Sequence, residues 1–277
     1  MIEKEYFLKN NFLDLSLSKR FFFIRDFSAM VEVTENLLPE KIQLGLKTKE
    51  EISNHYLTAG KLWEDLFKVD KFRETLTLID GDKSKHTEEI HQNLRNVRIG
   101  GIILRDANRL FSEKHLNSEP FYWFIKKLGL FNDNYENQVG DTPALDVVNA
   151  LKEYSSFLDL GEFIPCSPES LMEYLVKERD LIRAYLDEKM LTKDNMHDLR
   201  KTNRRFLNYF LLRVLDNTNN SSFEIYVYLR KINTYLGDCL DASVPSDSTN
   251  SSENLINIPQ DAVNLINTFQ NRVILNN

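Results

Sequence analysis

Apolar residues recur every three or four positions along most of this 277-residue chain, which is the spacing of a buried helix face. The segment 49–68 keeps this spacing throughout, and its predicted inner face consists of Ile52, Tyr56, Ala59, Trp63 and Leu66. Ser167, Pro168 and Glu169 supply a capping hydroxyl, a proline at the first helical position and an acid in the first turn. They predict a helix from 168 to about 189, whose apolar positions are Leu171, Tyr174, Leu175, Leu181, Ile182, Tyr185 and Leu186.

Other segments extend the helical pattern. Thr142 and Pro143 begin a further predicted helix, whose inner side consists of Val148, Leu151 and Leu158. A final helix is predicted from Pro259, and it packs back through Val263, Ile266, Phe269 and Val273. The segment 18–34 is rich in β-forming residues but has ambiguous periodicity, whereas 245–258 is dense in Ser, Asn and Asp and predicts an exposed loop or flexible linker. Because strand-like alternation is rare, and glycine (9) and proline (7) are scarce, the sequence predicts an all-α fold, a multi-helix bundle.

Composition and charge narrow the function classes. The hydrophobic share of 42% and the charged share of 28% are ordinary for a globular protein. A net charge of −7 argues against a general nucleic-acid or anionic-membrane binder. Cys166 and Cys239 are far apart in the sequence, so we expect neither a disulfide framework nor a cysteine zinc site. The N-terminus lacks the basic start of a signal peptide and no apolar run is long enough to span a membrane, so we expect a soluble cytoplasmic protein without a cofactor.

The segment 196–206, MHDLRKTNRRF, opposes the sign of the chain as a whole. On a helix its cationic side chains share one face, opposite Leu199, Phe206 and Phe210. Across 191–213 there are six Lys or Arg residues and two acids. Cations packed this closely repel one another unless an anion or a set of carboxylates lies across from them. One interpretation is therefore a solvated basic face paired with acids such as Glu173, Glu178 or Asp187.

A fainter copy of this segment occurs earlier in the chain. LRNVR at 94–98 matches MHDLR at 196–200, and each is followed by Leu-Gly and then an acid at the same offset. The first copy of this later motif is Leu128, Gly129 and Asp133, and the second is Leu236, Gly237 and Asp241. The internal spacing of the two copies differs by only six residues. Paired order and spacing predict a tandem duplication with an N-terminal extension of about 80 residues.

MHDLRKTNRR, followed by LRKINTYLGDCLDASV at 229–244, resembles the second repeat of a CHAD domain, the α-helical domain named for its histidine. LRNVRIGGIILRDANRLF at 94–111 and FIKKLGLFNDNY at 124–135 resemble the first repeat. The resemblance implies two pseudo-symmetric helical repeats over 86–244, flanked by an N-terminal extension packed on the bundle (1–85) and by a flexible loop with a C-terminal helix (245–277).

The resemblance also implies a function. Members of this family bind inorganic polyphosphate in a basic cleft between the repeats and are not catalysts. Carried over, the phosphate-binding residues from the second repeat are His197, Arg200, Lys201, Arg204 and Arg205. Those from the first repeat are Arg98, Arg105 and Arg109, with Arg95 at the position that matches the histidine. Ile102 and Ile103 match Arg204 and Arg205, so we expect one wall of the cleft to be partly apolar. The ligand that the resemblance implies is polyphosphate or another phosphate-rich anion.

Two alternatives stay open. Arg109 and His115 in RLFSEKH have the loose Arg-to-His spacing of helical ribonucleases of the HEPN type, in which such a pair acts on a ribose hydroxyl across a dimer interface. The simpler interpretation of His115 is a surface turn residue before an Asn-Ser-Glu-Pro segment. The other alternative is a helical scaffold without a ligand. His86 and His91 lie five apart, which is off the spacing of helical metal ligands, so no metal site is expected.

Overall fold

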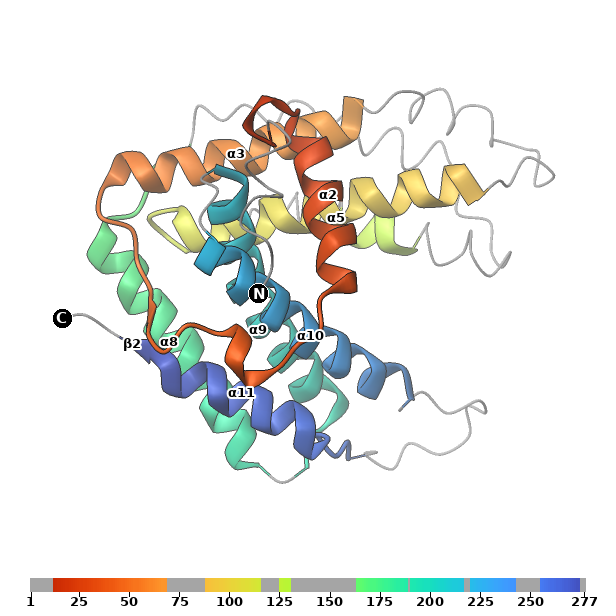
Figure 1. Ribbon diagram of the computed structural model, residues 1–277, viewed down its shortest axis with the longest axis vertical. Coiled ribbons are helices and arrows are strands. Elements are labelled where there is room, and N and C mark those ends of the chain that lie inside the picture. Colours follow the sequence, from red (N-terminus) through yellow and green to blue (C-terminus); the bar gives the residue numbers. More distant parts are fainter. Residues whose placement is uncertain are drawn as a thin grey trace.

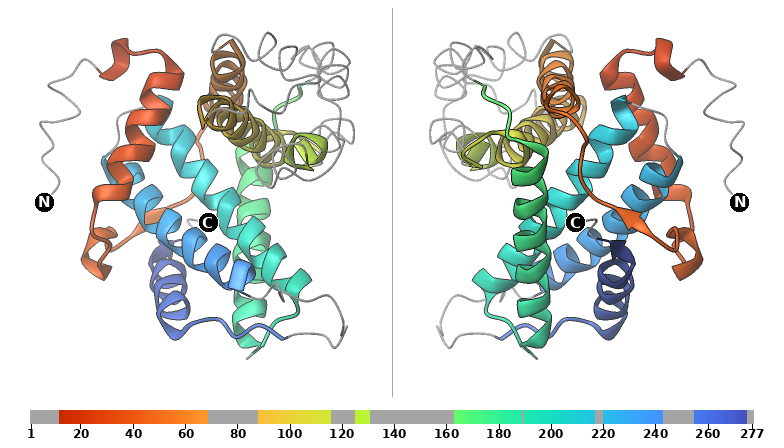
Figure 2. Two further views of the ribbon diagram at one scale, coloured as in Figure 1. Left: turned by 90° about the vertical axis from the view of Figure 1, so that its right-hand side faces the viewer. Right: turned by 90° about the vertical axis from the view of Figure 1, so that its left-hand side faces the viewer.

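A computed structural model describes residues 12–68, 88–115, 125–130, 163–188, 190–216, 220–242 and 255–274. Its long helices are α2 (Leu17–Met30), α3 (Lys49–Lys68), α5 (Glu88–Phe111), α8 (Pro168–Asp187), α9 (Lys193–Asp216), α10 (Asn220–Ala242) and α11 (Gln260–Arg272). Residues 125–130 are also helical, and two short 3-10 helices are η1 (Phe12–Asp14) and η2 (Glu35–Leu37). The predicted all-α fold class is confirmed (Figures 1 and 2).

The start of α8 is the one that the sequence predicts. The Ser167 hydroxyl accepts a hydrogen bond from the backbone N–H of Ser170 at 3.1 Å, and Pro168 is the first helical residue. A capping oxygen satisfies one of the backbone donors that a helix start leaves without an intrahelical partner. The predicted inner face is buried at Leu171, Tyr174, Leu175 and Ile182, whereas Leu181 is exposed.

Helices α3 and α5 run side by side (Figure 1). The predicted inner face of α3 is confirmed at Ile52, Ala59, Trp63 and Leu66, all of which are almost fully buried. Gly100 and Gly101 of α5 face this surface, and a Cβ atom at Gly101 would lie 2.9 Å from Trp63 Cζ3. The two glycines weaken α5 by about 1 kcal/mol each relative to alanine, but they allow α3 to approach closely. Ile103, on the same helix, is buried in the core.

Helices α9 and α10 form an antiparallel pair. Only three residues separate the last residue of α9, Asp216, from the first of α10, Asn220. The Asn203 side chain donates to the Leu229 carbonyl at 3.2 Å, which links residues at similar distances from this connection. The second half of α9 is buried on nearly all sides, since almost every residue from Arg205 to Leu215 is buried. The second half of α9 is therefore a central core helix, as Figure 2 shows.

Two segments far apart in the sequence meet in a small parallel sheet. Strand β1 (Ile42–Gln43) pairs with β2 (Val273–Ile274), with Ile42 opposite Val273. The Arg272 guanidinium donates to the Leu38 carbonyl at 2.6 Å beside this pair. Helix α11, predicted from Pro259, is confirmed, and its Ile266 and Phe269 are buried.

The ambiguous segment 18–34 is mainly helical, as α2, with Phe21 and Ile24 buried. None of the described helices combines the length and apolar character needed to cross a membrane. Several expectations concern residues outside the described part of the chain. They are the helix beginning at Thr142, the residues His86 and Asp133, and most of the predicted loop 245–258.

Candidate functional site

Helices α5 and α9 (labelled in Figure 1) pack against each other, and arginines from both halves of the predicted duplication lie on these two helices. We call Arg98, Arg105, Arg200 and Arg204 the cation cluster. The charge of Arg98 lowers the pKa of Arg200, and the charge of Arg204 lowers the pKa of both Arg200 and Arg105, although burial is the larger cause in each case. The fold therefore brings these four predicted residues close enough to repel one another.

A buried carboxylate, Asp106, holds part of this cluster together. Its Oδ2 accepts from Arg204 Nε at 3.0 Å and from Asn208 Nδ2 at 2.8 Å, while its Oδ1 accepts from Arg105 Nη2 at 3.0 Å. The Asp106 side chain is only 4% exposed. Burial by itself raises the pKa of Asp106, but Arg204 and Arg105 outweigh burial and hold the pKa below its usual value. Asp106 is therefore ionised and fixes the orientation of both arginines.

Arg98 and Arg200 each lie on a glycine of the neighbouring helical segment. A Cβ atom at Gly237 would lie 2.8 Å from Arg200 Nη2, and one at Gly129 would lie 2.9 Å from Arg98 Nη2. These are the arginines and glycines that match one another in the two predicted repeats. Asp238 and Asp241 act in the opposite direction to the neighbouring arginines and raise the pKa of Arg200. Any larger residue at either place would displace the guanidinium group.

The remaining residues predicted on the basic face of α9 lie nearer to solvent. His197 is exposed, and burial followed by Lys201 and Arg204 lowers its pKa. Lys201 Nζ forms an exposed ion pair with Asp198 at 3.0 Å. Arg95 on α5 is exposed as well. These side chains are accessible to a ligand that approaches the cation cluster from outside.

Arg205 is paired with a carboxylate of α8, although its charge is still close enough to the cation cluster to lower the pKa of Arg105. Its Nε donates to Glu178 Oε2 on α8 at 2.6 Å, and its Nη2 donates to the Thr202 hydroxyl at 2.9 Å. The side chains of Arg205 and Glu178 are both 8% exposed. Glu178 was one of the acids that the charge pattern offered as a partner for the basic helix. Arg205 is therefore engaged in a buried ion pair that joins α8 to α9.

Arg109 and His115 meet at Tyr174 of α8. Arg109 Nε donates to the Tyr174 hydroxyl at 3.0 Å, and the His115 ring stacks on the Tyr174 ring with centroids 4.6 Å apart. His115 Nδ1 donates to the Arg109 carbonyl at 3.1 Å, so its Nε2 accepts from the Ser170 hydroxyl at 2.9 Å in the neutral ring. His115 has a φ of 49° and is only half-buried, so it is a turn residue that also anchors α8. Burial raises the pKa of Tyr174.

Sequence reasoning missed Asp106, which orients Arg105 and Arg204, whereas it did offer Glu178 as one possible acidic partner of the basic helix. Asp106 lies between Ile103 and Leu110 at helical spacing, on a face that is otherwise apolar. Glu178 similarly lies between Leu175 and Ile182 on the inner face of α8. An acid on an apolar stripe is seldom buried without a cationic partner. An acid on an apolar helix face therefore predicts a buried ion pair, although the pattern does not identify the cationic partner.

Other chemistries have little support in the described part of the chain. Within it, no group of three or more His, Cys, Asp or Glu side chains could hold a metal ion. Burial raises the pKa of Cys166 to about 11, so this thiol stays protonated near neutral pH and is a poor nucleophile. The arrangement at the α5–α9 contact is suited instead to holding an anion through oriented N–H donors.

No family model, curated protein or solved structure matches this chain.

Proposed function

We propose that this chain is a non-enzymatic polyanion-binding protein, with inorganic polyphosphate as the leading ligand, bound at the cation cluster. The observation that carries the proposal is the convergence of Arg98 and Arg105 with Arg200 and Arg204, from segments about a hundred residues apart. Such a concentration of like charge is unfavourable by itself, and a bound anion would relieve it. The resemblance of both segments to the repeats of a CHAD domain supports the same ligand.

The chemistry of polyphosphate suits this surface. Its charge is distributed along the chain, and it carries no bases that a protein could distinguish. Binding therefore needs only a series of cationic donors, and each arginine can contact two oxygens at once. Residues one turn apart on a helix, such as Arg200 and Arg204, are separated by about 5–6 Å along its axis. That spacing is close to the length of two phosphoryl units.

The carboxylates restrict how long a bound chain can be. Arg204 gives its Nε to Asp106, which leaves its two Nη groups for a ligand, and Arg105 gives both Nε and Nη2 to the same carboxylate. Arg205 is occupied by Glu178 and Arg109 by Tyr174. The ligand-facing set is therefore Arg98, Arg200 and Arg204 with the more exposed His197 and Lys201. Such a set fits a short stretch of a phosphate chain rather than a long one.

A salt-dependent binding measurement tests the proposal. The binding of polyphosphate would be measured at low and moderate salt for the wild type and for the variant Arg98→Gln/Arg200→Gln. The matched control is Lys61→Gln/Lys177→Gln, which removes two exposed cations from α3 and α8. We expect wild-type affinity to fall steeply with salt, because each contact releases counterions. The arginine variant should bind weakly with a flatter salt slope, whereas the control should behave like the wild type.

The two alternatives predict other results, one in this binding measurement and one in an RNA cleavage assay. A ligand-free scaffold would show no binding at low salt, and its arginines would serve only Asp106 and Glu178. A ribonuclease using Arg109 and His115 would cleave RNA, and His115→Ala would abolish the cleavage. Either outcome would overturn the proposal.

A further inference from the structure

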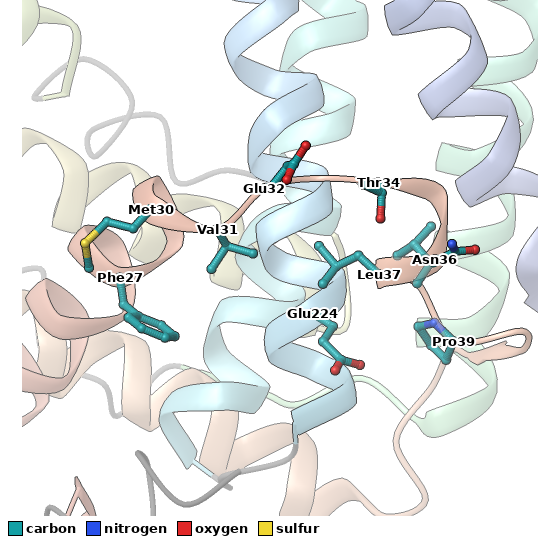
Figure 3. Close-up of a pocket in the computed structure, with 10 residues that line it drawn as sticks. Phe27, Met30, Val31, Glu32, Thr34, Asn36, Leu37, Pro39 and Glu224 are labelled. Atoms are coloured by element: carbon teal, nitrogen blue, oxygen red, sulfur yellow. The ribbon is translucent and has the colours of Figure 1, made fainter. Parts of the chain in front are cut away.

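A second candidate site lies away from these arginines, where the C-terminal end of α2 meets the segment 31–39 and α10 (Figure 3). The pocket has a volume of 680 Å³. Its ten described lining residues include Phe27, Met30, Val31, Leu37, Glu32 and Glu224. The volume lies within the range of pockets that hold small organic ligands, which is about 300–1,000 Å³.

The apolar part of the pocket is held firmly in place. The Phe27 ring is stacked between Phe23 and Phe223, with centroids 5.8 Å away in each case. Leu38 is buried in the core, whereas Met30 is 74% exposed. An aromatic ring and a flexible thioether together can adapt to apolar ligands of varied shape. These walls would cover the body of a small apolar ligand.

Among the described residues that line the pocket, the polar ones are acidic or neutral. Two of the ten lining residues are glutamates, and none is Lys, Arg or His. In Figure 3 the carboxylates of Glu32 and Glu224 lie on opposite sides of the apolar Val31 and Leu37. A ligand bound on these apolar side chains would therefore have a carboxylate near either end. An anion would be repelled by both carboxylates, whereas an ammonium group would be attracted.

We propose that this pocket binds a small amphipathic amine, which places its apolar body against Phe27, Val31 and Leu37 and its ammonium group beside Glu32 or Glu224. This ligand has the opposite charge to the one proposed for the cation cluster, and nothing in this inference depends on polyphosphate binding. The two glutamates supply selectivity for charge, and the apolar walls supply most of the contact area.

The test compares two probes of nearly the same shape. The binding of 1-naphthylmethylamine and of its uncharged counterpart 1-naphthylmethanol to the full chain would be measured by calorimetry. We expect the amine to bind at least about tenfold more tightly, because only the amine gains the attraction of the carboxylates. Equal affinities, or no binding of either compound, would overturn the proposal.

Three variants locate the binding. Glu32→Gln/Glu224→Gln should remove the preference for the amine. The matched control, Glu173→Gln/Glu188→Gln, changes the net charge by the same amount at two exposed positions, one in α8 and one directly after it. This control should leave the preference intact. Thr34 also lines the pocket, so Thr34→Trp should block it and abolish binding of both probes. Thr34 is exposed and its side chain makes no capping hydrogen bond, so this variant should fold normally. Unchanged binding in Thr34→Trp would place the probes elsewhere and overturn the proposal.

Discussion

The guanidinium group of Arg200 lies against the backbone of Gly237, at a distance that leaves no space for a Cβ atom. The same relationship holds between Arg98 and Gly129. Both arginines belong to the cation cluster, and both glycines lie in helical segments where alanine would otherwise be favoured. Each glycine therefore lowers the stability of its own helix but leaves space for the guanidinium group of an arginine.

The first prediction is that Gly237→Ala separates stability from binding. The new Cβ would displace only the end of the flexible Arg200 side chain, and alanine stabilises a helix by about 1 kcal/mol relative to glycine. We therefore expect the free energy of unfolding to stay equal or rise while polyphosphate affinity falls. Denaturant unfolding and a binding titration check the two effects. Loss of stability together with unchanged affinity would contradict the account.

Gly101→Ala is expected to have the opposite effect on stability. A Cβ at this position would meet the Trp63 ring at 2.9 Å, in a core where Trp63 is only 2% exposed and has little room to shift. Overpacking of this kind costs about 1–3 kcal/mol, which exceeds the gain in helix propensity. Thermal unfolding of Gly101→Ala beside Gly237→Ala gives the comparison. A stabilised Gly101→Ala variant would show that α3 and α5 do not pack as closely as described.

Some elements of the fold and of the candidate site can be predicted from local sequence patterns, and others cannot. The helices α3, α8 and α11 follow from local spacing and start signals, so they are predictable. Helix α2 was ambiguous because its Phe-rich run suits a strand equally well, and only packing of Phe21 and Ile24 against distant helices decides the outcome. Asp106 and its partner Arg204 are 98 residues apart, and no local pattern specifies such a pair. The arginines were predicted, and Glu178 was one of the acids offered as a partner, but Asp106, which orients Arg105 and Arg204, was not predicted.

Asp106→Asn is predicted to destabilise the chain strongly. It leaves Arg105 and Arg204 largely buried without their carboxylate, a change that costs about 3–5 kcal/mol for a buried ion pair. The pKa of Asp106 is lowered in the folded state, so its stabilising contribution is present above the unfolded pKa of about 3.9 and is lost as the pH falls through the folded value. Unfolding curves between pH 7 and pH 3 should therefore show a weaker pH dependence in the variant. Identical slopes in both proteins would rule out this role.

The ion pair between Arg205 and Glu178 is predicted to serve stability alone. Removing one partner, as in Glu178→Gln, should cost about 3–5 kcal/mol because the other charge stays buried. The double variant Glu178→Leu/Arg205→Met should recover most of that loss, since apolar residues of similar size can replace such a pair. Polyphosphate affinity of the double variant should equal that of the wild type. A large loss of affinity would return Arg205 to the ligand-binding set.

His55 provides a prediction about mild acid. Its Nδ1 lies 2.9 Å from the Glu51 carbonyl and 3.3 Å from Asp216 Oδ2, and burial lowers its pKa despite the neighbouring Asp216. The unfolded chain therefore binds a proton at this residue more readily than the folded chain. Stability should be full above pH ~6.5 and fall as the pH drops toward the folded pKa, by up to about 1.4 kcal/mol per pH unit. In His55→Gln this decline should be smaller, and parallel curves for the two proteins would contradict the prediction.

The parallel pairing of β1 with β2 has a consequence for how the chain is made. Ile42 and Val273 lie far apart in the sequence, and their pairing joins them across all of the intervening helices. Contacts this distant in sequence form late, because the chain must first lose the entropy of closing a long loop. During synthesis β1 has no partner until β2 has left the ribosome. This sheet can therefore form only after all of the helices between the two strands have been made.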